Sequence, residues 1–432
     1  MPLQVITIPF FRQRYPRWTV FGTAGAVLAL LATMLWGLNG RNDLDVFLAA
    51  TNDLLAGRSA YSATYFDGYH YYYGTTFAIL LSPLALLPAS LAKLAWGLLM
   101  ASATARCIWL VFTHWLPTGL SSTERAAILS IALLVLFQSM RDNFNAGQVT
   151  PLVLWLCMEG VTRLGTRSVI SGALLIAFGI DLKILPLVLV PWMVYRAHWR
   201  ALAVCVGAVV ALQFLPSLVL GWQHNLDLLA ARWELVRPTN LDHVLDEEEP
   251  SFIALSSVLT AFFSTEGHNP HTLHLPRLVM ALSAETLAAW LLAGRLVIVA
   301  AALWFLRWRT MFRRTTAQHT WWEFAYLTLC SVLLFPHQRH YSMLMALPAI
   351  LLLCTYTIAV PALRAGRIWL GLCALAFVGM SCDLLFGAYA DLFMHYKLLS
   401  FMVLLLLGML AWCNPQRLEQ AVEDRSHRIV PL

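Results

Sequence analysis

Charged side chains are scarce in this chain, at 12% of 432 residues, whereas 59% of the residues are hydrophobic. A soluble domain of ordinary composition has about twice that share of charge, so the composition excludes a typical soluble globular protein. Apolar runs of roughly 15–22 residues recur along the whole length, and about 20 such residues are enough for a helix to cross a bilayer. The sequence therefore predicts an all-α polytopic membrane protein.

Motifs that would bind metals or nucleotides are also missing. The eight cysteines lie in or beside apolar segments and form no C-x-x-C pair, which indicates neither a zinc site nor a disulfide framework. His268, His271 and His274 are loosely spaced, and Pro270 interrupts the helix that would align them, so we expect a loop without metal. No glycine-rich nucleotide loop occurs. We expect no cofactor and no metal.

The basic residues indicate an orientation in the membrane. The net charge of +6 comes mostly from Lys and Arg at the ends of apolar runs, where they set topology, so it does not predict nucleic-acid binding. Arginines precede the first run, Trp18–Leu38, and no small-residue cleavage site follows, so we expect a retained first helix. Counting later runs predicts about twelve transmembrane helices in a bacterial inner membrane, with both termini cytoplasmic. Thr75–Leu87, which contains Pro83, is expected to be re-entrant or short. If it crossed fully, Arg163 and Arg167 would fall on the outer side, against the rule that basic loops are cytoplasmic.

Residues 1–432 are expected to form a single membrane domain. Residues 39–77 would form the first outer loop. Residues 221–285 would form a large outer loop, in which Ser251–Phe263 is a helix lying on the membrane. The run Ser168–Pro191 contains two charges near its middle, so we expect two short helices that meet there.

The first outer loop is rich in carboxylates and aromatic rings. Carboxylates beside a bilayer cost free energy unless they are solvated or paired, so this many suggest a function. A solvated loop with tyrosines in an interfacial belt is the alternative. The residues concerned are Asp43, Asp45, Asp53, Asp67, Tyr61, Tyr65, Tyr69, His70, Tyr71, Tyr72 and Tyr73.

Four polar clusters are predicted on the same outer face: Asp43 with Asp45, Arg141–Gln148, Asp181 with Lys183, and His337–Tyr341. Each has an ordinary explanation, since Lys183 could snorkel, Arg141 could pair with Asp142, and His340 could be a buried imidazole. Because all four fall on one side, we predict that they share an outer cavity.

Such a set suits sugar transfer from a lipid-phosphate donor. A carboxylate can take the proton of an acceptor hydroxyl, and cations can stabilise the departing phosphate. A transporter or flippase of a lipid-linked glycan is the alternative, since it would use the same groups for binding alone. No inverted repeat is visible and the clusters lie at one face, which disfavours transport.

The motifs in these clusters resemble those of integral-membrane glycosyltransferases of the C-type fold, and within them glycosyltransferase family 87. That family includes polyprenyl-phosphate-mannose-dependent mannosyltransferases of lipid glycan assembly. The similarity covers most of residues 18–360. It depends on Asp43-Leu44-Asp45-Val46-Phe47, Leu55-Ala56-Gly57 with Tyr61, Gly147-Gln148-Val149, Lys183-Ile184-Leu185-Pro186 and the turn Pro336–Tyr341.

The resemblance implies an inverting transferase on the periplasmic face. It would move a sugar, mannose or another hexose or pentose, from a polyprenyl-phosphate donor to a lipid or glycan acceptor among membrane lipids. The catalytic carboxylate falls on Asp43, with Asp45 as the alternative. Donor-phosphate ligands are expected at Lys183, Arg339, His340 and Arg141, and sugar or acceptor ligands at Gln148, Tyr61, His337 and Tyr341.

The chain departs from the family pattern at two places. Tyr73-Gly74-Thr75 stands where a Tyr-Pro-Pro-like step is common, and Gln338 and Arg339 stand where a Trp often precedes the His. The resemblance therefore does not identify the sugar.

Overall fold

The computed structural model describes residues 5–8, 13–16, 25, 28, 32, 40–66, 68–165, 168–237, 243–245, 251–265, 273–307, 311–313 and 315–429. The predicted first helix therefore lies almost wholly outside the described residues. Asp67, the acidic run 246–249, His268 and His271 also lie outside them.

The described part of the chain is helical apart from one antiparallel hairpin, β1 (Val5–Ile8) with β2 (Gln13–Pro16). The first helices are α2 (Asp43–Leu55), α3 (Thr75–Leu80), α4 (Ser82–Ala85), α5 (Ala89–Leu110) with the π-helix η1 (Val111–Trp115), α6 (Ser122–Ala146), α7 (Thr150–Leu164) and α8 (Val169–Leu182). Next come the 3-10 helix η2 (Leu185–Val188), α9 (Leu189–Tyr195), α10 (Trp199–Phe214), α11 (Ser217–Leu220), α12 (Trp222–Val236), α13 (Leu255–Phe263) and α14 (Ala284–Leu306). The last are α15 (Ala317–Leu334), η5 (His340–Ala346), α16 (Leu347–Ala359), α17 (Pro361–Arg364), α18 (Arg367–Met380), α19 (Cys382–Phe386), η6 (Gly387–Tyr389), α20 (Ala390–His395), α21 (Leu398–Trp412) and α22 (Pro415–Ile429).

Five of the described helical segments are long and apolar enough to cross a membrane, or seven if two bent pairs each count as one span. They are α5 with η1, α6, α10 with α11, α14, and η5 with α16; the bent pairs are α18 with α19–α20, and α21 with α22. The prediction of a helical membrane protein is confirmed. By this criterion the described residues do not reach the predicted count of about twelve; the predicted first helix lies almost wholly outside them, and α8 and α9 are too short to meet the criterion.

Helix α6 extends further than the sequence suggested. It starts with a capping box, in which the Ser121 hydroxyl accepts from the Glu124 amide at 3.2 Å and the Glu124 carboxylate accepts from the Ser121 amide at 3.0 Å. It ends only at Gly147, whose φ of 63° is left-handed. Residues 141–146, which belong to the predicted polar cluster Arg141–Gln148, therefore form the helical end of α6, because the cap lies seven residues after Met140, where the apolar run ends.

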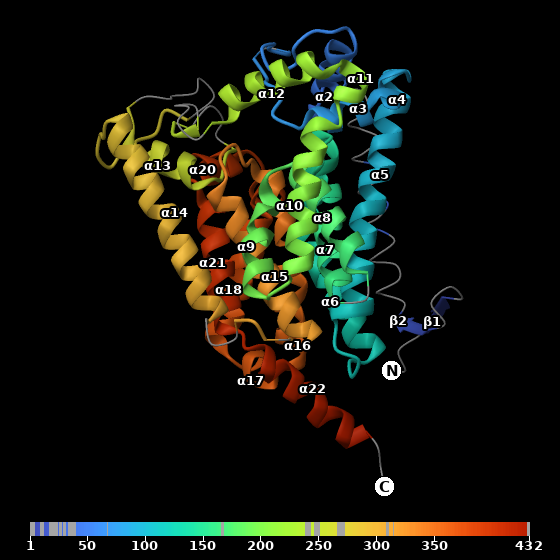
Figure 1. Ribbon diagram of the computed structural model, residues 1–432. Coiled ribbons are helices and arrows are strands. Elements are labelled where there is room, and N and C mark those ends of the chain that lie inside the picture. Colours follow the sequence, from blue (N-terminus) through green and yellow to red (C-terminus); the bar gives the residue numbers. More distant parts are fainter. Residues whose placement is uncertain are drawn as a thin grey trace.

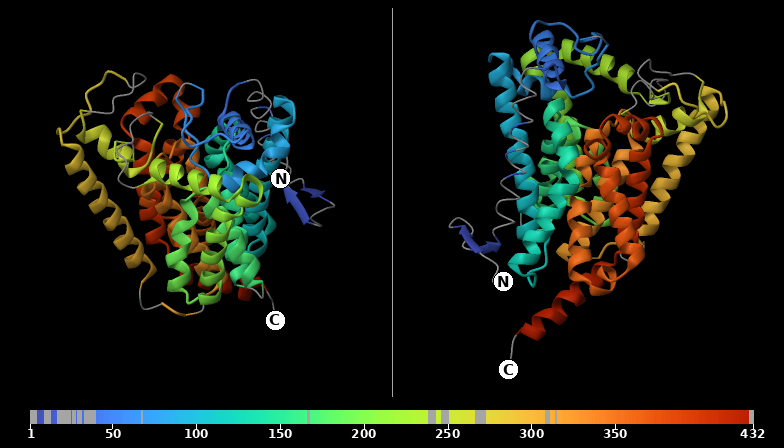
Figure 2. Two further views of the ribbon diagram at one scale, coloured as in Figure 1. Left: turned by 45° about the horizontal axis from the view of Figure 1, so that its top comes forward. Right: turned by 180° about the vertical axis from the view of Figure 1, so that it is seen from behind.

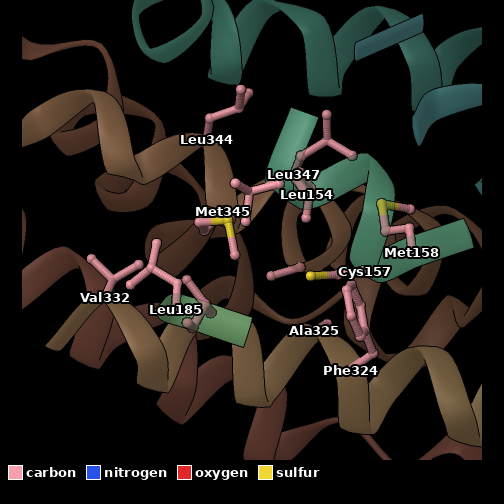
Figure 3. Close-up of a cluster of buried hydrophobic side chains, with 14 of the residues drawn as sticks. Leu154, Cys157, Met158, Leu185, Phe324, Ala325, Val332, Leu344, Met345 and Leu347 are labelled. Carbon is pink, nitrogen blue, oxygen red and sulfur yellow. The ribbon is translucent and has the colours of Figure 1, made fainter. Parts of the chain in front are cut away.

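The core of the bundle is formed by α7, η2, α15, η5 and α16. Figure 3 shows side chains from these elements packed on one another, including Cys157 of α7, Leu185 of η2, Phe324 of α15 and Met345 of η5. All four are buried. Two breaks between helices that matter for the site lie beside this core: one at Lys183, two residues before η2, and one at Arg339, directly before η5.

The two ends of the bundle differ. Helices α2, α3 and α12 lie at one end, and α17 and α22 lie at the other, as Figures 1 and 2 show. We call these the α2 end and the α22 end. Helix α12 runs across the α2 end rather than along the bundle. It falls in the segment 221–285, where only a helix within Ser251–Phe263 was expected; α13 covers most of that range.

Candidate functional site

Asp43 is the first residue of α2 and is half-buried. The side-chain amide of Gln148 donates a hydrogen bond to its Oδ2. The Tyr73 hydroxyl in turn donates to Gln148 Oε1 at 3.2 Å. Gln148 is almost fully buried, so its amide has a fixed orientation between the tyrosine and the carboxylate.

The turn from α6 to α7 places Gln148 against α2. Trp96 Nε1 donates to the Gly147 carbonyl at 2.8 Å. A Cβ at Gly147 would lie 3.0 Å from side-chain atoms of Asn42, the residue that caps α2. Both the left-handed backbone and this contact favour glycine, and the motif Gly147-Gln148-Val149 thus brings the amide to Asp43.

Asp45 has different surroundings. Its carboxylate lies 2.9 Å from Lys93 Nζ and accepts from the Asn42 amide at 2.8 Å. Lys93 also donates to the Gly40 carbonyl at 2.6 Å, and its side chain is only 8% exposed. Arg41, the basic residue nearest to Asp45 in the sequence, instead places its guanidinium over the Phe66 ring. Asp45 therefore caps α2 through the Asn42 amide and links α2 to α5 through Lys93.

A cation from another part of the chain acts on Asp43, and a second cation acts on the first. Lys183 follows α8 directly, and it interacts electrostatically with both Asp43 and Arg339. Its Nζ lies 5.2 Å from the centre of the Tyr341 ring, and among the described residues it has no hydrogen-bond partner. We call Asp43, Tyr73, Gln148, Lys183, Arg339 and Tyr341 the central cluster.

Tyr73 stays neutral in this cluster. Burial raises the pKa of its hydroxyl, and the negative charge of Asp43 raises it further, while Arg339 opposes the shift. The hydroxyl is therefore a hydrogen-bond donor throughout the physiological pH range, which maintains the bond to Gln148.

The turn 336–341 positions Arg339. Its guanidinium lies over the rings of Tyr69 and Phe252, at 5.4 and 5.6 Å from their centres. The backbone on either side is bound to the segment before α13: Ile253 donates to the Gln338 carbonyl at 2.7 Å, and His340 donates to the Ser251 carbonyl at 3.0 Å.

His337 begins the same turn in a left-handed conformation, with φ of 56°. Its Nε2 lies 2.7 Å from Nδ1 of His243, and its ring stacks on Tyr72 with centres 5.1 Å apart. His337 is therefore on the aromatic side of the turn.

Arg141 and His340 gather around a different carboxylate. Arg141 Nη2 lies 2.7 Å from Asp142 Oδ1 and also pairs with Asp383. His340 Nε2 lies 3.4 Å from Asp142 Oδ2, and the Asp142 side chain is only 7% exposed. Of the four predicted phosphate ligands, Lys183 and Arg339 thus join Asp43, whereas Arg141 and His340 form a separate group.

Tyr61 is buried rather than open to a ligand. Its hydroxyl donates to the Tyr73 carbonyl at 2.9 Å and lies 2.9 Å from the Thr75 hydroxyl. Burial raises the pKa of this hydroxyl. These contacts fix the backbone beside the central cluster.

A polar network that sequence reasoning missed lies beneath this backbone. Gln213 Nε2 donates to Asp181 Oδ1 at 2.7 Å, and Arg232 of α12 donates to Gln213 Oε1 at 3.0 Å. A Cβ at Gly74 would lie 2.9 Å from each carboxylate oxygen of Asp181. A proline would have the same clash, which explains why glycine replaces the Tyr-Pro-Pro-like step. The amide of Gln213 within an apolar run was the available signal.

Metal binding has no obvious place in the part of the chain that the structure describes. Within it, no three His, Cys, Asp or Glu side chains are grouped so that they could hold an ion.

The fold and this cluster define a helical membrane protein with a carboxylate and two cations gathered at one end of its bundle. The family model of glycosyltransferase family 87 matches residues 71–336, well over half of the chain. The chain belongs to this family and is a glycosyltransferase. A search of curated proteins finds no match. The matched range includes Tyr73, Gln148 and Lys183, whereas Asp43 precedes it and Arg339 follows it.

Proposed function

We propose that the chain transfers a sugar, with inversion, from a polyprenyl phosphate to a lipid-linked or glycan acceptor. It would act at the periplasmic face of a bacterial inner membrane, as a C-type fold with about twelve transmembrane helices. Family membership supports transfer over transport, since the matched family is one of glycosyltransferases. The observation that carries the proposal is the carboxylate of Asp43, held by Gln148 and within electrostatic range of Lys183.

In the proposed reaction, Asp43 takes the proton of the acceptor hydroxyl as its oxygen attacks the anomeric carbon. The bond from that carbon to the donor phosphate oxygen breaks, and polyprenyl phosphate leaves with one more negative charge. Lys183 and Arg339 stabilise this charge as it develops. A single displacement inverts the anomeric centre, so the acceptor and the phosphate lie on opposite faces of the sugar.

The other predicted ligands have graded roles. Gln148 orients Asp43, and the Tyr341 ring, which is buried, lies beneath Lys183 and supports its ammonium group. His337 lies in the turn 336–341 with Arg339, where its ring stacks on Tyr72. Tyr61 contributes by fixing the backbone at Tyr73.

The decisive experiment compares Asp43→Asn with Asp45→Asn. Each purified variant in nanodiscs is given labelled polyprenyl-phosphate sugar, and release of polyprenyl phosphate and donor affinity are both measured. We expect Asp43→Asn to lose at least about 10²-fold in turnover while still binding donor, because asparagine cannot accept the proton.

Asp45→Asn is the matched control on the same helical turn. We expect it to retain turnover and to lose thermal stability, because it weakens the pair with Lys93. If Asp43→Asn retains more than about a tenth of wild-type turnover, Asp43 is not the base. If only Asp45→Asn is inactive, the base is Asp45.

A further inference from the structure

A cavity of about 650 Å³ lies at the α22 end, away from the central cluster. The ends of α16, α17, α18, α21 and α22 enclose it. Its lining is mostly apolar, but it includes two arginines, Arg367 and Arg417. A cavity that combines apolar walls with two cations fits an amphiphile with an anionic head.

Helix α18 directs its N-terminus into this cavity. Gly366, which caps α18, has no side chain to accept from the first-turn amides, and residues 366–369 all line the cavity. No hydrogen bond from the amides of Arg367, Ile368 or Trp369 is found among the described residues. Open amides and the helix dipole favour an anion at this point.

Tyr356 of α16 provides an independent indication. Its side chain is 1% exposed, yet its hydroxyl has no hydrogen-bond partner among the described residues. It lines the same cavity and interacts electrostatically with Arg417. Glu419 also acts on Tyr356, but its carboxylate accepts from the Thr316 hydroxyl. A buried hydroxyl without a partner costs free energy, so a ligand oxygen would stabilise it.

Exposed apolar side chains flank the cavity. Ile368 is 70% exposed and Trp412 is 55% exposed, and both contribute to its lining. Tryptophan beside arginine is typical of helix ends at the surface of a bilayer. The ligand therefore reaches the cavity from the membrane rather than from bulk water.

We propose that this cavity binds the phosphate head of an anionic phospholipid, held by Arg367, Arg417, the α18 amides and the Tyr356 hydroxyl. The acyl chains would lie along the apolar side chains around Ile368 and Trp412. This site is separate from the transfer reaction, and it holds whichever side of the membrane the α22 end faces.

The test is native mass spectrometry of delipidated protein titrated with phosphatidylglycerol. Removing both arginines as Arg367→Gln with Arg417→Gln should weaken phosphatidylglycerol binding about fivefold for each charge. Tyr356→Phe, which leaves both charges, should weaken it as well. Arg364→Gln is the matched control, because Arg364 is exposed on α17 beside the cavity but does not line it. Phosphatidylcholine should bind the wild-type chain more weakly.

Several results would overturn the proposal. Wild-type affinity in the double variant and in Tyr356→Phe would show that the cavity holds no lipid head. An equal loss in Arg364→Gln would indicate general surface charge. Displacement of phosphatidylglycerol by inorganic phosphate at equal concentration would identify a site for free phosphate instead.

Discussion

At the scale of single residues, the contrast between Asp43 and Asp45 comes from their neighbours. Two positions apart on a helix, their side chains point about 200° away from each other, so they cannot share one partner surface. Lys93 neutralises Asp45, whereas Asp43 faces Gln148. Both carboxylates lie in the first turn of α2. This difference in surroundings is the basis for proposing Asp43, and not Asp45, as the base.

Lys183→Ala should lower turnover by roughly 10²–10³-fold with little change in thermal stability. Its Nζ has no hydrogen bond to lose among the described residues, so its charge remains available to a developing phosphate. Turnover and melting temperature of the purified variant in nanodiscs check this.

Arg141→Gln is the control for that experiment, because Arg141 is already paired with two carboxylates. We expect it to lower the melting temperature more than the turnover, since it leaves Asp142 buried with less compensation. Near-wild-type turnover in Lys183→Ala would contradict the assignment of Lys183 to the leaving group.

Residue types and spacing could predict the charged members of the cluster, because a charged side chain beside a bilayer costs free energy unless it is solvated or paired. They could not predict partners. Lys93 appeared as an ordinary residue at the start of an apolar run, yet it is the partner of Asp45. Tyr61 was expected to contact a ligand, and only its buried hydrogen bonds reveal its place in the backbone. Partner choice depends on tertiary contacts, which a single sequence does not display.

At the scale of elements, periodic apolar runs located most long helices well. Helix α12 was missed because it mixes polar and apolar residues, and a search for continuous apolar runs passes over such a helix. The last turn of α6 was missed because polar residues 141–146 resemble a loop. In both cases tertiary contacts and caps, rather than composition, set the boundary.

Gly74→Ala should destabilise the chain by about 1–3 kcal/mol and lower turnover, because the new Cβ would push against the Asp181 carboxylate and displace Tyr73. Thermal unfolding and transfer assays measure the two effects. Gly207→Ala is the control, since a Cβ there has no neighbour within 4 Å and alanine is the better helix former. Equal melting temperatures for Gly74→Ala and the wild type would show that the carboxylate moves aside without cost.

At the scale of the whole molecule, the central cluster and the proposed lipid site lie at opposite ends of one bundle (Figure 1). The sequence predicted a membrane bundle correctly. The number of crossings depends on short and bent helices such as α8, α9 and the α18–α19 break. Length and composition do not determine whether such helices cross the membrane.

The two ends should be accessible from different compartments. In a variant without native cysteines, Asn145→Cys should react with a membrane-impermeant thiol reagent in intact spheroplasts, because exposed Asn145 lies at the α2 end of α6. Gln416→Cys, exposed on α22, should react only after permeabilisation. The reverse pattern would place the central cluster in the cytoplasm.

The central cluster is assembled from segments that are far apart in the chain, since Asp43, Gln148, Lys183 and Arg339 belong to four separate stretches. During synthesis the ribosome completes the first three long before the last. A nascent chain that has inserted its first helices therefore holds Asp43 without Arg339. Under the proposed mechanism such a chain should transfer sugar poorly until the turn before η5 has docked on residues 251–253, so the order of the chain would itself limit premature transfer.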